Sequence, residues 1–191
     1  MEHTIERFEN ASSIDEIILV LSSEHLDKAE SFNFTKLKKV VEGGDSRAAS
    51  VLNGLSAIEG DEGIVAVHDG ARPLVSIDEI DRTIEKARQV GAACLTAPVT
   101  DTIKSVRGGE IASTLDREKL RRALTPQAFE LKLLRRAFAE ADINAAATDE
   151  CFVVEKLGHP IAIVEGSSRN IKITHYEDLI LAKALIEDLN T

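Results

Sequence analysis

The stretch IVAVHDGARP, residues 64–73, joins a four-residue apolar run to a polar segment that carries Asp69 and Arg72. An apolar run without polar alternation is typical of a strand buried on both faces of a parallel sheet. Ligands of open α/β sheets bind beyond the carboxyl ends of the strands. The stretch therefore predicts a buried strand that ends in a ligand-binding loop.

Strand-like and helix-like segments alternate on both sides of this stretch. Further apolar runs predict strands at 14–21, 37–41, 92–99, 161–164 and 171–173, and helical patterns cover 45–58, 76–90, 129–141, 149–157 and 174–189. The helix at 76–90 opens with a Ser76/Glu79 capping box, and the helix at 174–189 opens with a similar Thr174/Glu177 pattern. This alternation predicts an α/β fold, a mostly parallel sheet flanked by helices, in one domain over residues 1–191.

Residues 102–115 break the alternation. Two short β-like runs flank Arg107-Gly108-Gly109-Glu110, which predicts a β-hairpin about a Gly-Gly turn. A two-stranded hairpin is marginal in water by itself. We therefore expect residues 100–118 to form a protruding arm that packs against something else, such as a second subunit.

Composition excludes several classes of protein. The net charge of −10 argues against nucleic-acid or anionic-membrane binding, so an anionic substrate needs a local basic pocket. Cys94 and Cys151 lack metal-ligand spacing and are expected to be reduced thiols. No apolar run approaches the roughly 18 residues of a membrane span, and the first residues do not resemble a signal peptide. We expect a cytoplasmic protein.

Two loops carry most of the candidate chemistry. Asp69 is placed to ligate Mg²⁺ and Arg72 to bind a phosphate, although the two could simply pair with each other; His68 is interpreted as a structural histidine. Gly43 and Gly44 allow a close approach to a ligand before a helix N-terminus, or form a tight turn with Asp45 or Ser46 as N-cap.

The remaining polar segments are weaker signals. Residues 116–122 are typical of a solvated helix face, 125–127 of a turn, and 148–150 of a helix N-terminus, whereas 165–172 place basic residues beside a glycine turn.

Six segments match a known family in order. They are Gly43–Leu55, Val67–Pro73, Ala97–Lys104, Leu124–Gln127, Thr148–Glu150 and Asn170–Thr174. Together they make the chain resemble 2-C-methyl-D-erythritol 4-phosphate cytidylyltransferase of the non-mevalonate isoprenoid pathway, a homodimeric nucleotidyltransferase with a Rossmann-like sheet.

The resemblance implies a role for ten residues. Gly44, Asp45 and Ser50 would bind the cytidine nucleotide, and Asp69 would ligate Mg²⁺ and contact the substrate. Arg72, Thr125 and Thr148 would face the methylerythritol phosphate. Lys172 and Arg117 would be catalytic, with Arg117 and Thr102 reaching the partner's site from the arm. The phosphate oxygen of the polyol phosphate would attack the α-phosphorus of CTP and release pyrophosphate.

One family feature does not occur in these 191 residues: an N-terminal strand followed by a Gly-rich loop with phosphate-binding cations. We expect the chain as given to be weak or inactive, prone to aggregate, and to leave 17–20 and 64–67 with unpaired strand edges. Two alternatives stay open: a ribitol-5-phosphate cytidylyltransferase, and a non-catalytic remnant that dimerises or binds nucleotide.

Overall fold

The computed structural model describes residues 1–140 and 149–189. The elements follow in chain order as α1 (Glu2–Asn10), β1 (Ile17–Leu21), η1 (Ser23–Ser31), β2 (Leu37–Glu42), α2 (Arg47–Ser56), β3 (Ile64–Val67), α3 (Ile77–Val90), β4 (Ala92–Pro98), β5 (Lys104–Arg107), β6 (Glu110–Thr114), η2 (Arg117–Lys119), β7 (Arg121–Glu130), α4 (Leu131–Glu140), α5 (Glu150–Lys156), β8 (Ala162–Glu165) and α6 (Tyr176–Leu189).

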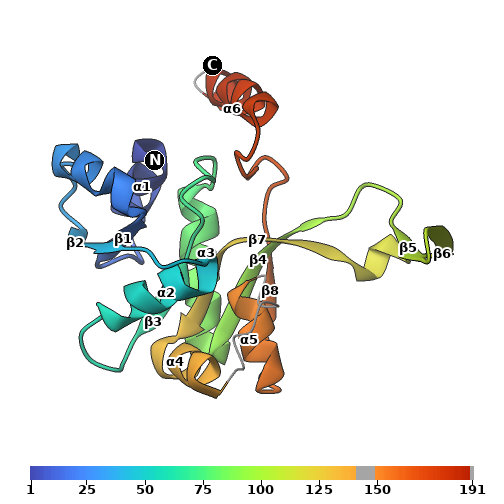
Figure 1. The fold of residues 1–191 in the computed structure, drawn as a ribbon, viewed down its shortest axis with the longest axis horizontal. Coiled ribbons are helices and arrows are strands. Elements are labelled where there is room, and N and C mark those ends of the chain that lie inside the picture. Colours follow the sequence, from blue (N-terminus) through green and yellow to red (C-terminus); the bar gives the residue numbers. More distant parts are fainter. Residues whose placement is uncertain (141–148, 190–191) are drawn as a thin grey trace.

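The strands form an α/β core with one strand reversed (Figure 1). Strands β1 and β2 pair in parallel, and a second sheet has the order β3-β7-β4-β8. Strand β7 is antiparallel to both β3 and β4, whereas β4 and β8 are parallel, so β3, β4 and β8 all run in one direction. Within the described residues, β1 and β3 each pair on one side only, as the sequence predicted.

Two assignments from sequence were wrong. Residues 121–130 form the long strand β7, where a charged helix face, a turn and a helix start were expected. A proline is unusual in a central strand because it has no N–H to donate, and the β4–β7 register is irregular opposite Pro126, between Cys94 and Thr96. Residues 171–173 are irregular, held by the Ile173 N–H donating to the Ala71 carbonyl.

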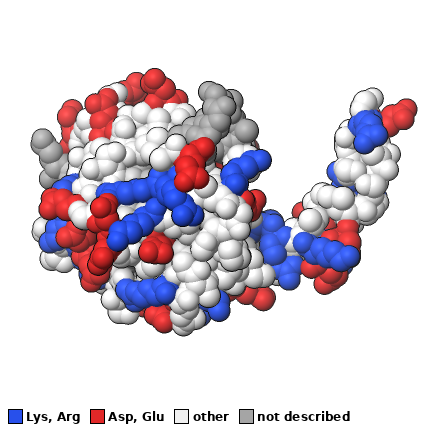
Figure 2. All heavy atoms as spheres, turned by 90° about the horizontal axis from the view of Figure 1, so that it is seen from below, with Lys and Arg blue, Asp and Glu red and all other residues white. Residues whose placement is uncertain are grey.

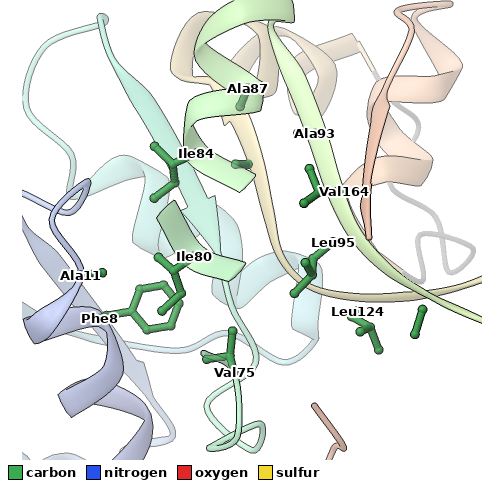
Figure 3. Close-up of a cluster of buried hydrophobic side chains, with 12 residues drawn as sticks. Phe8, Ala11, Val75, Ile80, Ile84, Ala87, Ala93, Leu95, Leu124 and Val164 are labelled. Atoms are coloured by element: carbon green, nitrogen blue, oxygen red, sulfur yellow. The ribbon is translucent and has the colours of Figure 1, made fainter. Parts of the chain in front are cut away.

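The core fills both faces of the sheet. Successive residues of β4 point to opposite faces, as the pleat requires. Ala93 and Leu95 pack with α1 and α3, in the cluster shown in Figure 3. Ala92 and Cys94 pack with residues of α2, α4 and α5 on the other face. The result is three layers, helix, sheet and helix.

Local signals set the helix ends. The Ser76/Glu79 capping box of α3 is present, and Gly91 closes that helix at φ 87°, a conformation that favours glycine. At α6 the expected pattern was wrong in one respect. Asp178, and not Glu177, accepts hydrogen bonds from the backbone N–H groups of Thr174 and His175.

The hairpin is confirmed and stands away from the body of the molecule (Figure 1). Gly108 and Gly109 adopt φ values of 60° and 85° in its turn. Val106 and Ile111 are 65% and 68% exposed. The arm therefore shows apolar side chains to solvent within a single chain.

The charged run after the hairpin was expected as a solvated helix face. It forms only the short turn η2 before β7 begins.

Both cysteines are buried free thiols. A hydrogen bond with Cys94, together with burial, raises the pKa of the Cys151 thiol. In the described part of the chain, no helix is long and apolar enough to cross a membrane.

Candidate active site

The loop after β3 carries a carboxylate that forms ion pairs with three cationic side chains. Asp69 Oδ2 lies 3.2 Å from Arg72 Nε and 3.1 Å from Lys172 Nζ, and Asp69 Oδ1 lies 3.3 Å from Arg47 Nε. The Asp69–Arg72 pairing considered from sequence therefore exists, but as part of a larger cluster. Asp69 and Arg72 are each 13% exposed, and Lys172 is 40% exposed, so the cluster reaches the surface.

Lys172 reaches this loop because the segment after β8 is bonded to it. The Arg72 guanidinium donates to the Asn170 carbonyl at 2.9 Å, and the Ile173 N–H donates to the Ala71 carbonyl at 2.9 Å. The buried Asn170 amide donates to the Thr125 carbonyl of β7. The first two of these bonds join residues that lie about a hundred positions apart in the chain.

His68 and Thr125 hold the Asp69 loop in place through hydrogen bonds to its backbone. The Asp69 N–H donates to Thr125 Oγ1, so the single hydroxyl proton of Thr125 is available for His68 Nδ1, 3.0 Å away. His68 Nε2 then carries the ring proton and donates to the Arg72 carbonyl. Burial lowers the pKa of His68 to about 4, so the ring is neutral at neutral pH. His68 is structural, as the sequence suggested.

Arg47 links Asp69 to a second carboxylate. Its Nη1 and Nη2 donate to Glu150 Oε1 and Oε2 at 2.5 and 2.9 Å, the two-pronged geometry that suits guanidinium and carboxylate. Glu150 is the first residue of α5 and its side chain is 1% exposed. Neither residue was given a role from sequence, although both lie inside segments that matched the family.

The pKa shifts follow from burial and charge. Burial alone would raise the pKa of the Asp69 carboxyl, but the Arg47 and Lys172 charges outweigh it and the pKa lies below its usual value. Burial by itself would lower the pKa of Arg47, but the hydrogen bonds and charge of Glu150 raise it, and the pKa lies above its usual value. Burial also raises the pKa of Glu150, opposed by the bonds from Arg47. Asp69 is therefore an anion held by fixed cations.

The glycine loop after β2 lies at the start of α2. Ser46, and not Asp45, is the N-cap, accepting from the Ala49 N–H. The Ser50 hydroxyl accepts from the Gly44 N–H, and a Cβ at Gly44 would lie 2.5 Å from Ala49 Cβ. Only glycine fits at this position, whereas the side chain of Asp45 is exposed. The loop is thus a tight, glycine-dependent turn beside Arg47.

The cluster has the chemistry of a phosphate site. Three cations face two carboxylates there, a net formal charge of one positive. Elsewhere, on the face seen in Figure 2, basic and acidic side chains lie interspersed. A local excess of cations in an acidic protein is suited to hold anionic phosphates and to stabilise charge that develops on them.

Comparison with known proteins identifies the family. The sequence profile of 2-C-methyl-D-erythritol 4-phosphate cytidylyltransferase (IspD) matches residues 1–188. The chain belongs to this family.

Relatives of known name agree with this cytidylyltransferase assignment. The Desulforamulus reducens enzyme of that name is 43% identical over 199 residues, with 100% of this chain and 84% of that protein covered. The Bacillus licheniformis enzyme is 40% identical, with 97% and 82% covered. The crystal structure of the Thermus thermophilus cytidylyltransferase superposes with a TM-score of 0.81 at 36% identity, covering 97% of this chain and 88% of that one.

The structure brings together part of the predicted site. Asp69, Arg72, Lys172 and the Thr125 hydroxyl meet in one cluster, and Gly44, Asp45 and Ser50 lie just before or in the first turn of α2, whose first residue contacts Asp69. Thr102 and Arg117 are different, since they belong to the arm that leaves the body (Figure 1), where Arg117 donates to the Thr100 carbonyl. Thr148 lies outside the described residues.

Proposed function

We propose that this chain transfers CMP from CTP to 2-C-methyl-D-erythritol 4-phosphate and releases pyrophosphate. The observation that carries the proposal is the convergence of Arg47, Arg72 and Lys172 on Asp69 at the end of β3. Family membership supplies the substrates, since relatives sharing about 40% of the sequence bear this activity in their names.

The residues have separate tasks in this reaction. A phosphate oxygen of the polyol phosphate attacks the α-phosphorus of CTP in line with the departing pyrophosphate. Lys172 stabilises the negative charge that develops on the α-phosphate, and Arg72 holds the acceptor phosphate. Gly44, Asp45 and Ser50 bind the cytidine and Thr148 contacts the polyol. Thr125 is only 4% exposed and its hydroxyl is bonded to His68 and to the Asp69 N–H, so it acts by holding the Asp69 loop. No covalent enzyme intermediate is required.

Asp69 is suited to hold Mg²⁺. A magnesium ion in such sites commonly takes one or two protein carboxylates and completes its shell with substrate phosphates and water. Of the two carboxylates in the cluster, Asp69 is 13% exposed, whereas Glu150 is 1% exposed and paired with Arg47, so Asp69 is the one open to a metal ion. No group of three or more His, Cys, Asp or Glu side chains forms a metal site among the described residues. Asp69 would hold the ion, which would supply positive charge to the triphosphate.

We further propose a homodimer in which the arm of one chain completes the site of the other. The arm carries exposed apolar side chains and stands clear of the cluster in its own chain (Figure 1). Arg117 and Thr102 then contact the acceptor bound by the partner.

Substitution of Asp69 tests the proposed activity. We expect Asp69→Asn to lower the rate of 4-diphosphocytidyl-2C-methyl-D-erythritol formation by about 100-fold or more, since it removes the metal carboxylate. Product is measured by mass spectrometry and pyrophosphate by a coupled assay. Asp15→Asn, at an exposed position in the loop before β1, is the control and should match the wild type.

Two results would contradict the proposal. One is the absence of both product formation and CTP binding in the wild type, which is the behaviour of a non-catalytic remnant that only dimerises. The other is faster turnover with ribitol 5-phosphate than with 2-C-methyl-D-erythritol 4-phosphate in parallel assays.

A further inference from the structure

Glu150 is a buried carboxylate without an obvious purpose in the fold. Its side chain is 1% exposed at the first turn of α5, and placing a charge there is costly unless the charge is fully paired. Both oxygens accept from Arg47, which lies 103 positions earlier in the chain. The cost of this buried pair calls for an explanation.

Anchoring of α5 does not explain it. Asp149 caps that helix by accepting from the Phe152 N–H, and the fully buried Gln127 of β7 donates to Asp149 and accepts from the Cys151 N–H at 2.9 and 3.0 Å. Gln127 therefore already joins the start of α5 to the sheet. An apolar side chain at position 150 would serve packing at least as well as a buried ion pair.

The third contact of Arg47 gives the explanation. Its Nε donates to Asp69 Oδ1 at 3.3 Å, so one planar guanidinium joins Glu150 to Asp69. Because the guanidinium is rigid, fixing its two Nη groups on Glu150 fixes the direction of Nε. Asp69 Oδ1 is held on that side, and Oδ2 is turned toward Lys172 and Arg72.

We propose that Glu150 and Arg47 form a positioning pair that orients the Asp69 carboxylate for the metal–nucleotide complex. The inference rests on the proposed function, because it takes Asp69 as the group that meets the metal. It adds two residues that act through Asp69 and do not touch substrate.

The test compares Glu150→Gln with Glu155→Gln, an exposed glutamate on the same helix. Three quantities are measured on the whole protein. The first is the Mg²⁺ concentration that gives half of the maximal rate, and the second is the melting temperature. The third is the affinity for Mn²⁺ in the presence of CTP, obtained from the electron paramagnetic resonance signal of free Mn²⁺. We expect Glu150→Gln to raise the Mg²⁺ requirement and weaken Mn²⁺ binding by about 10-fold, the usual scale for groups that orient a metal ligand. Glu155→Gln should match the wild type.

A second variant guards against misfolding of the first. Arg47→Lys keeps the charge but cannot reach both carboxylates at once. It should reproduce the metal defect, and the double variant should be no worse than either single variant, because the two residues act as one unit. Additive losses would overturn the proposal, as would a lower melting temperature with an unchanged Mg²⁺ requirement.

The metal titration separates this inference from the proposed activity. Should the wild type bind Mn²⁺ with CTP but form no product, the proposed function fails while the comparison of variants still decides the role of Glu150. Should the wild type not bind Mn²⁺ with CTP, both proposals fall.

Discussion

His68 shows how one partly buried side chain ties the candidate site to the pH dependence of stability. The ring is neutral in the folded protein because burial lowers its pKa from 6.5 to about 4. The unfolded chain binds a proton near pH 6.5, whereas the folded chain does not bind it until about pH 4. Stability from this group is therefore complete above pH 6.5 and is lost as the pH falls toward 4.

We predict that His68 accounts for a loss of roughly 3 kcal/mol in the free energy of unfolding between pH 7 and 4. Urea unfolding at a series of pH values measures this, with His68→Gln as the comparison because glutamine does not titrate. The difference between the two curves isolates His68 from the carboxylates that titrate in the same range. Parallel curves for the two proteins would contradict the prediction.

The cluster around Asp69 also shows which contacts a sequence reveals. Asp69 and Arg72 were predicted as candidates because they lie three residues apart after a buried strand, and Lys172 through the family resemblance. The Arg47–Glu150 pair had no such signal. The pair forms because the first residues of α2 and α5 meet in the fold, although Arg47 and Glu150 are 103 positions apart in the chain. Spacing along the chain does not reveal which helix ends meet.

At the scale of elements, the capping box of α3 offers a clean test of local stability. The Glu79 N–H donates to the Ser76 hydroxyl, and Glu79 Oε2 accepts from the Ser76 N–H, so two end groups of the helix are satisfied. Glu79 Oε1 also accepts from the Ser167 N–H, which ties the helix start to the segment after β8.

We expect Ser76→Ala to cost about 1 kcal/mol of folding free energy, as loss of a helix N-cap typically does. Ser56→Ala is the matched control, since Ser56 ends α2 and its hydroxyl donates only to the Leu52 carbonyl within its own helix. Denaturant unfolding of both variants gives the comparison. An equal change in the free energy of unfolding for the two substitutions would show that the Ser76 cap does not stabilise the protein.

Elements with one strong periodic signal were predicted well, and β7 was not. The strands β3 and β4 are short apolar runs, and α3 has both a cap and a glycine stop. Strand β7 begins with Arg121 and Arg122 and contains Pro126, which together indicate a solvated or turning segment. Its central place comes from pairing with β3 and β4, an interaction between distant segments that outweighs local preference.

At the scale of the whole molecule, the exposed arm predicts the oligomeric state. Val106 and Ile111 are about two-thirds exposed, and the paired strands β5 and β6 form a sheet of their own. We expect Val106→Asp with Ile111→Asp to convert the proposed dimer to a monomer, because a charge on the proposed contact face would have to be desolvated when the subunits meet. Light scattering after size-exclusion chromatography measures the mass.

Leu181→Asp is the control for this arm variant. Leu181 is 49% exposed on α6, away from the arm, and its substitution should leave the mass unchanged. A dimer that survives both substitutions on the arm would place the interface elsewhere.

Because the arm is proposed to act in the partner's site, a substitution in one chain can inactivate the site of the other chain. If Arg117 works in the neighbour's site, a chain with a faulty arm keeps its own chemistry and disables its neighbour's. A chain without Lys172 has the opposite defect. Co-expression of these two inactive proteins would then regain function in trans, because each mixed pair contains one site with both cations intact.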